Sequence, residues 1–183
     1  YDPTTKNNLD LVQWAIEAHS SGWGYVWGTY GHVLTRSYYE AKLAQYPEGV
    51  GNYADFILAN WLGKRTADCV GLVKGYCWFD PEAQSIGYAV NGMPDIATEQ
   101  MIEWCDEKGS MDTMPEIPGL LLWMDGHVGI YIGDGYAIEA MGTRYGVVKT
   151  QVAGRGWQKW GKIPCIEYIE EAEETEPTEA AVG

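Results

Sequence analysis

The stretch GLLLWMDGHVGIYIGDGYAIEAMGTRYGVVKTQV, residues 119–152, decides the fold. Four β-rich runs follow one another in it, GLLLWM, HVGIYIG, GYAIEAM and GVVKTQV, with glycine-containing turns between them. A fifth run, KIPCIEY, follows at residues 162–168. The part of the chain before this stretch has helical patterning, so helices come first and strands afterwards. This order predicts an α+β fold in which helices pack on a roughly five-stranded antiparallel sheet.

The helical part divides into segments that begin at recognisable capping residues. We expect five helices, over residues 8–20, 35–46, 52–62, 68–79 and 98–108. Each begins at a side chain that can accept a bond from a backbone N–H of the first turn: Asn8, Thr35, Asn52, Asp68 and Thr98. Between the helices we expect a glycine- and aromatic-rich loop at residues 21–32 and a long connection at residues 80–96.

Composition indicates one domain with a real core. The chain has 183 residues, of which 46% are hydrophobic. Its net charge of −14 argues against nucleic-acid binding, which needs a basic face. It contains no run of about 18 apolar residues, so we expect no membrane span. Because the chain begins at Tyr1 and shows no signal peptide, we interpret it as a processed or excised domain.

The last residues differ from the rest of the chain. Residues 170–183 carry six Glu and neither Lys nor Arg. Their apolar content is too low to build a core. We therefore expect a folded domain over residues 1–168 and an acidic linker over residues 169–183.

Four cysteines stand at positions 69, 77, 105 and 165. They form no C-x-x-C pair and the three His are far apart in sequence, so we expect no zinc site and no other cofactor. A disulfide between Cys105 and Cys165 and a set of small buried thiols are both compatible with the spacing.

Cys69 stands where a nucleophile can be activated. If Asp68 caps the helix, Cys69 is the first helical residue, and a helix N-terminus stabilises a thiolate. Its own backbone N–H is then one of the unpaired donors that can hold an oxyanion. A cysteine in a helix is nevertheless usually a core residue, and Cys77 and Cys105 keep that interpretation.

A base and an orienting group follow on neighbouring strands. In HVGIYIG, alternation places His127 and Gly129 on one face of the strand. If residues 133–135 form a three-residue turn, Gly129 faces Glu139 and the carboxylate lies on the face of His127. A two-residue loop would send Glu139 to the other face. A lone His is usually structural, and His19 and His32 keep that interpretation.

These segments resemble the NlpC/P60 cell-wall cysteine peptidases. YVWG at residues 25–28 resembles the aromatic motif of the family, and DCVGLV at 68–73 resembles its nucleophile block, Asp-Cys-Ser-Gly-Leu-Val. The segment from Pro118 to Ala140 resembles the two strands that carry the catalytic His and the third polar residue. MPDIATEQM resembles, more weakly, the segment between helix and sheet. The resemblance spans roughly residues 8–168.

The resemblance implies a papain-like fold and hydrolysis of peptidoglycan stem peptides between γ-D-glutamate and a diamino acid. It implies that Cys69 is the nucleophile, His127 the base, and Glu139 the third residue where the family commonly has a second His. Tyr25 and Asp68 match positions that bind the free amine of a stem peptide. The expected substrate contacts are Tyr25, Trp27, Asp68 and Val70.

The chain departs from the family pattern at three places. Val70 replaces the usual Ser, Glu139 replaces the common His, and the stretch at residues 29–66 is much longer than usual. We expect this helical insertion to rebuild one wall of the substrate groove. The expected protein is a monomer, secreted or associated with the bacterial cell wall, or a phage lysin, whose acidic tail could tether it to a wall-binding domain.

Two other functions fit the same residues. The protein could be an N-acetylmuramoyl-L-alanine amidase or an acyltransferase on the same scaffold. It could instead be a non-catalytic cell-wall-binding module whose platform is built from tryptophans: Trp23, Trp27, Trp157 and Trp160.

Overall fold

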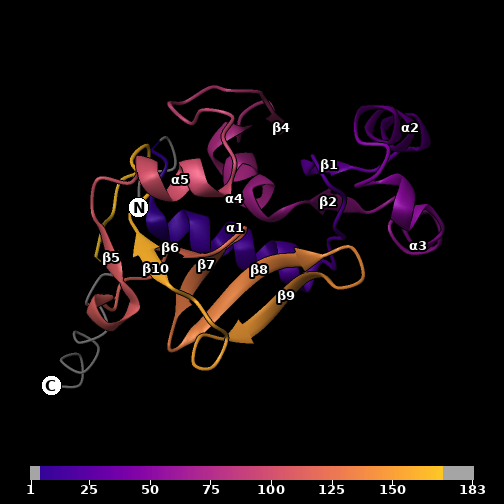
Figure 1. The fold of residues 1–183 in the computed structure, drawn as a ribbon. Coiled ribbons are helices and arrows are strands. Elements are labelled where there is room, and N and C mark those ends of the chain that lie inside the picture. Colours follow the sequence, from indigo (N-terminus) through magenta and orange to yellow (C-terminus); the bar gives the residue numbers. More distant parts are fainter. Residues whose placement is uncertain (1–4, 171–183) are drawn as a thin grey trace, which may run out of the picture.

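The strand-rich half of the chain forms one antiparallel sheet of six strands, so the predicted α+β class is confirmed (Figure 1). The computed structural model of the protein describes residues 5–170, and the tail expected to be a linker lies almost wholly outside them. The strand order is β5-β10-β6-β7-β8-β9, with antiparallel neighbours throughout. The strands are β5 (Lys108–Ser110), β6 (Leu121–Met124), β7 (His127–Gly133), β8 (Tyr136–Gly142), β9 (Gly146–Gln151) and β10 (Lys159–Gly161).

Two of the six strands do not lie where the sequence predicted a strand. The four runs within residues 119–152 match β6 to β9, whereas the run at residues 162–168 is not a strand and β10 ends just before it. The helix expected over residues 98–108 is also too long, because α5 (Thr98–Trp104) ends early and Lys108 pairs with Gly161. Both errors concern short strands that pair with distant segments, since β5 pairs with β10 and β10 lies between β5 and β6.

The helices agree better with the sequence. They are α1 (Asn8–Ser20), α2 (Arg36–Gln45), α3 (Ala54–Asn60), α4 (Cys69–Trp78) and α5, with 3-10 turns η1 (Gly51–Tyr53) and η2 (Met111–Thr113). Thr35 and Asp68 are N-caps as predicted. The other three predicted caps are wrong, because the residues at the N-cap positions are Asn7, Tyr53 and Ala97. Asn8 is instead fully buried, and its side chain bonds to the backbone of Pro118 and Ile169.

Two short hairpin-like pairs were not predicted. Strand β1 (Tyr30–Val33) emerges from the expected loop and pairs with β2 (Arg65–Ala67), so the helical insertion leaves and re-enters the domain at adjacent points. Strand β3 (Phe79–Asp80) pairs with β4 (Ser85–Ile86) within the expected long connection. The β1–β2 pair joins segments distant in sequence, whereas β3 and β4 form a local hairpin of two-residue strands.

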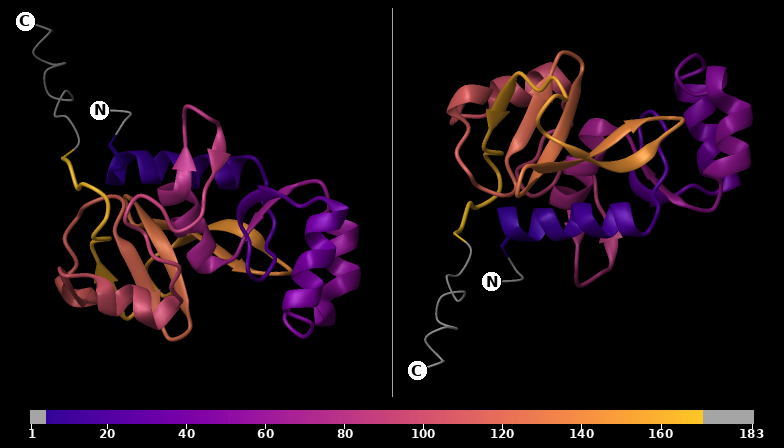
Figure 2. Two further views of the ribbon diagram at one scale, coloured as in Figure 1. Left: turned by 90° about the horizontal axis from the view of Figure 1, so that it is seen from above. Right: turned by 90° about the horizontal axis from the view of Figure 1, so that it is seen from below.

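The main core lies between the helices and one face of the sheet. Helices α1 and α4 both contact β7 and β8, and Figure 2 shows α1 running along the sheet. Fully buried aliphatic side chains from both layers meet there, among them Leu11, Val73, Val128 and Ile130. A second cluster on the opposite face of the sheet includes Leu122, Tyr131 and Trp157.

Helices α2 and α3 form a separate small core at one end of the molecule (Figure 2). Val26, Leu34, Tyr39, Val50 and Ile57 are its buried members. The helical segment therefore folds around its own apolar residues together with Val26 of the YVWG loop.

All four cysteines are free thiols. Cys77 and Cys105 are buried, as expected for core residues, and the sulfur of Cys165 lies 3.8 Å from that of Cys77. Within residues 5–170 no helix has the length and apolar character needed to cross a membrane.

Candidate active site

Cys69 opens helix α4, and Asp68 fixes that helix to the YVWG loop. One oxygen of the Asp68 carboxylate accepts a bond from the Gly71 N–H at 2.7 Å, and the other accepts from the Gly28 N–H at 2.8 Å. The helix also passes very close to the residue before β1, since a Cβ atom on Gly71 would lie 2.0 Å from the carbonyl oxygen of Thr29. The YVWG loop and the DCVGLV segment are thus joined by the Asp68 side chain, which accepts hydrogen bonds from a backbone N–H of each.

The thiol of Cys69 lies in a largely desolvated place. Burial first, and the charge of Asp68 second, raise its pKa from 9.0 to about 12. The backbone N–H groups of Val128, Val70 and Cys69 oppose this rise in part. Since Val128 directly follows His127, the thiol lies next to the start of strand β7.

His127 and Glu139 are in direct contact across strands β7 and β8. The His127 Nε2 atom lies 2.7 Å from the Glu139 Oε1 atom. The turn between the strands contains two residues, Asp134 and Gly135, but a register shift between Tyr131 and Gly133 compensates for it. The pairs Ile130–Ile138 and Tyr131–Ala137 therefore keep Gly129 opposite Glu139, which is the register that a three-residue turn predicts.

The Glu139 side chain is fully buried, and both of its carboxylate oxygens accept hydrogen bonds. It accepts bonds from His127, from the Thr150 hydroxyl at 2.6 Å, and from Arg155 through Nε at 2.9 Å and Nη2 at 2.6 Å. Burial alone would raise its pKa, but the bonds from His127, Arg155 and Thr150 outweigh burial and lower the pKa from 4.5 to about 2. Glu139 is consequently an anion at neutral pH.

Sequence reasoning missed three residues of this cluster. Thr150 comes from β9, while Arg155 and Trp157 come from the loop between β9 and β10. The Trp157 ring stacks on the His127 imidazole, with 5.5 Å between centroids and 16° between planes. Gly129 leaves room for it, because a Cβ there would lie 2.8 Å from the Trp157 ring. The glycines on either side of Arg155 are the only sequence signal of this loop. They predict a turn but not that the loop returns to His127 and Glu139.

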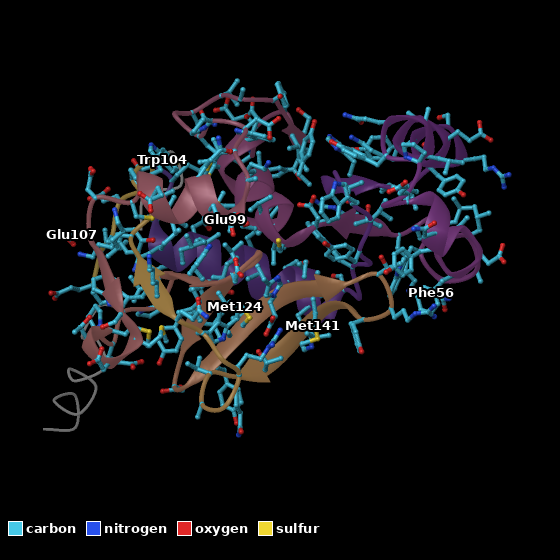
Figure 3. All side chains as sticks on the ribbon, viewed as in Figure 1. Phe56, Glu99, Trp104, Glu107, Met124 and Met141 are labelled. Atoms are coloured by element: carbon cyan, nitrogen blue, oxygen red, sulfur yellow. The ribbon has the colours of Figure 1, made fainter. Side chains whose placement is uncertain are left out.

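A cavity of about 1160 Å³ brings the predicted site residues together. Those that line it are Tyr25, Trp27, Asp68, Cys69, Val70 and His127. Glu139 lies behind His127, outside the lining. Helix α2 contributes to the cavity on one side and α5 on the other, and Figure 1 places them on opposite sides of α4. Figure 3 labels three more lining residues: Glu99 of α5, Met124 of β6 and Met141 of β8.

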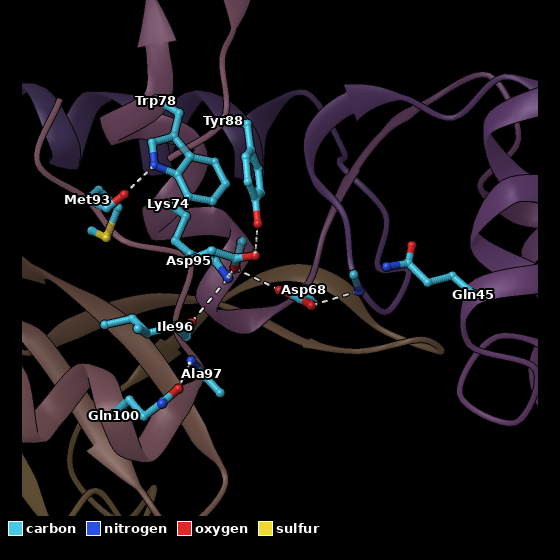
Figure 4. Close-up of polar contacts among 12 residues, drawn as sticks. Gln45, Asp68, Lys74, Trp78, Tyr88, Met93, Asp95, Ile96, Ala97 and Gln100 are labelled. Atoms are coloured by element: carbon cyan, nitrogen blue, oxygen red, sulfur yellow. Dashed lines mark hydrogen bonds and ion pairs between the residues drawn. The ribbon is translucent and has the colours of Figure 1, made fainter. Parts of the chain in front are cut away.

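Two charged residues that line the cavity, Lys74 and Asp95, are paired with each other. Lys74 of α4 donates to Asp95 at 2.6 Å and to the Ile96 carbonyl at 3.1 Å (Figure 4). The Tyr88 hydroxyl donates to the other oxygen of Asp95. Within residues 5–170, no group of three or more His, Cys, Asp or Glu is placed to hold a metal ion.

The tryptophans expected to form a wall-binding platform do not lie on one exposed surface. Trp23 and Trp157 are buried, with 3% and 7% of their surfaces exposed. Trp27 is 51% exposed and lines the cavity. The four-tryptophan platform is therefore wrong for at least two of its members.

No protein-family model matches this chain, and no curated protein sequence matches it either. Several solved structures do resemble it. The NlpC/p60 domain of the peptidoglycan hydrolase SagA is 19% identical, with 84% of this chain and 96% of that chain covered and a TM-score of 0.47. The peptidoglycan hydrolase RipB of Mycobacterium tuberculosis is 21% identical, with 88% and 68% covered and a TM-score of 0.47. The P60 domain of a Mycobacterium avium subspecies paratuberculosis antigen is 19% identical, with 87% and 97% covered and a TM-score of 0.47.

Proposed function

We propose that the protein is a cysteine peptidase that hydrolyses peptidoglycan stem peptides. One observation carries the proposal: His127 is held 2.7 Å from the buried Glu139 carboxylate, and it lines the same cavity as Cys69 at the start of α4. A cysteine, a histidine and an anion that orients the histidine are the parts that thiol-dependent acyl transfer requires. The resemblance of the sequence motifs supplies the substrate class.

The orientation of His127 assigns its two ring nitrogens. Because Nε2 is engaged by Glu139, Nδ1 is the nitrogen left to take the thiol proton of Cys69. The thiolate attacks the scissile carbonyl, and His127 gives the proton to the leaving amine as the C–N bond breaks. Water, activated by His127, then hydrolyses the acyl-enzyme. Glu139 remains ionised throughout and stabilises the imidazolium form.

The oxyanion that forms when the thiolate attacks accepts hydrogen bonds from two donors. We assign the backbone N–H of Cys69 as the first donor and the Tyr25 hydroxyl as the second. The first N–H groups of a helix have no partner within the helix, and Cys69 is the first residue of α4. Tyr25 lines the cavity, and burial, followed by Asp68 and Cys69, raises its pKa. Its hydroxyl therefore keeps its proton and can donate.

We assign the peptide bond between γ-D-glutamate and the diamino acid as the bond that is cleaved. Tyr25 and Asp68 are assigned to the free amine at the start of the stem peptide, as the motif resemblance implies. Both line the cavity beside Cys69. Trp27 and Val70 complete the contacts around the peptide, and Val70 presents an apolar surface where the resembling motifs have a hydroxyl.

The test is digestion of purified peptidoglycan with wild-type protein and with Cys69→Ala. We expect the wild type to release new amino termini and Cys69→Ala to lose at least about 1,000-fold in rate, because the nucleophile is removed. Cys165→Ala is the matched control, since Cys165 does not line the cavity. Equal rates for wild type and Cys69→Ala would reject the proposal. Fragment masses identify the bond, because an amidase would instead release whole stem peptides from muramic acid.

A further inference from the structure

Helix α2 presents a set of hydrogen-bond donors to the cavity. Lys42, Gln45 and Tyr46 all line it; Lys42 and Gln45 lie three residues apart on one face of the helix, and Tyr46 is its C-cap residue. The Lys42 ammonium donates to the Gln45 Oε1 atom at 3.0 Å and lies 5.5 Å and 5.7 Å from the ring centroids of Tyr38 and Tyr46. The Gln45 amide nitrogen donates to the Tyr46 hydroxyl at 3.2 Å. Figure 4 shows Gln45 reaching from α2 toward Asp68.

Among the described residues, Lys42 lacks an ion-pair partner, unlike the two other Lys and Arg side chains that line the cavity. Lys74 is paired with Asp95, and Arg155 with Glu139, both at 2.6 Å. Lys42 forms no ion pair with any of the described residues, 5–170. Its side chain is half-buried, and burial lowers its pKa while the charges of Asp68 and Asp95 oppose that change. A bound anion is stabilised most strongly beside a partly desolvated cation that has no ion-pair partner.

The position of these donors is fixed relative to the nucleophile. The Tyr46 ring packs on Gly28, where a Cβ atom would lie 2.4 Å from the ring. The N–H of Gly28 in turn donates to Asp68, the cap of the helix that Cys69 opens. The donors on α2 are therefore connected to the start of α4 through one residue of the YVWG loop.

We propose that Lys42, Gln45 and Tyr46 form a carboxylate subsite that makes the protein prefer stem peptides with a free carboxylate over their amides. This inference rests on the proposed function for its substrate class. A peptide linked through the γ-carboxyl of glutamate keeps its α-carboxylate free, and the diamino acid supplies a second carboxylate. Amidation of either group removes the charge and leaves its size unchanged. The subsite is thus a specificity determinant contributed by the helical insertion.

Calorimetric binding to the inactive Cys69→Ala protein tests the subsite without turnover. The probes are one tripeptide, L-Ala-γ-D-Glu-diamino acid, and its two carboxamides, made at glutamate or at the diamino acid. We expect at least one carboxamide to bind about 10-fold or more weakly than the acid, because a charge-assisted hydrogen bond is lost. When Lys42→Met is added, the ratio of the affinity for the acid to the affinity for the carboxamide should fall to about 1. Lys42→Arg should retain most of that ratio. Met keeps the apolar stem of the side chain, so packing against Tyr38 and Tyr46 is preserved.

Lys64→Met is the matched control, because Lys64 is exposed and does not line the cavity. An acid-to-amide ratio that is unchanged by Lys42→Met, or already near 1 without it, would overturn the subsite. Turnover by the protein with Cys69 intact is measured separately. If the protein cleaves the peptide but the acid-to-amide ratio does not depend on Lys42, this inference alone is rejected. If the ratio depends on Lys42 but the protein does not cleave, only the proposed peptidase is rejected.

Discussion

The Cys69 thiol faces two opposing influences, the N–H groups at the start of α4 and the desolvation that surrounds it. Desolvation dominates and raises its pKa to about 12. We therefore expect iodoacetamide to alkylate Cys69 about 100 times faster at pH 9 than at pH 7, because below the pKa the thiolate fraction grows tenfold per pH unit. Mass spectrometry of the Cys69 peptide measures this rate. A rate that is already constant between pH 6 and pH 8 would contradict the expectation and would indicate a preformed thiolate–imidazolium pair.

The residues that the sequence identified are those with a local pattern around them. Asp68 and Cys69 mark a helix start, and His127 and Glu139 sit on strands whose alternation fixes their face. Arg155 has no such pattern, although it makes two of the bonds that hold Glu139. Its position depends on how the loop after β9 returns to the sheet, and that path is determined by tertiary packing of Trp157 on His127.

Helix α4 depends on glycine where it passes the residue before β1. A Cβ atom at Gly71 would lie 2.0 Å from the Thr29 carbonyl oxygen. We expect Gly71→Ala to lower the free energy of unfolding by about 1–3 kcal/mol or more, because backbone must shift, although alanine favours the helix by up to about 1 kcal/mol. Urea denaturation measures the change. Gly142→Ala is the control, because its Cβ would meet nothing nearer than Tyr145, at 3.7 Å. Equal stability of the two variants would contradict the close approach.

The same dependence on distant partners explains which elements were predicted. Strands β6 to β9 follow one another along the chain and alternate clearly, so their local pattern sufficed. Strands β5 and β10 have three residues each and are far apart in sequence; β5 is defined by pairing with β10, and β10 by pairing with β5 and β6. The end of α5 was misplaced for the same reason, because Lys108 follows helical residues in sequence but pairs with Gly161.

The whole molecule should lose stability in acid as Glu139 becomes protonated. The Glu139 carboxylate links β7, β8, β9 and the loop after β9. Its pKa is about 2 in the folded protein, below the ordinary 4.5, so the contribution is complete above pH 4.5 and is lost as the pH falls through 2. This difference corresponds to about 3 kcal/mol. We expect urea unfolding from pH 6 to pH 2 to show a larger loss of stability for wild type than for Glu139→Gln, which cannot titrate. Glu40→Gln, at an exposed ion pair with Arg36, should follow the wild type. If wild type and Glu139→Gln lose stability in parallel, the buried carboxylate does not set the acid sensitivity of the fold.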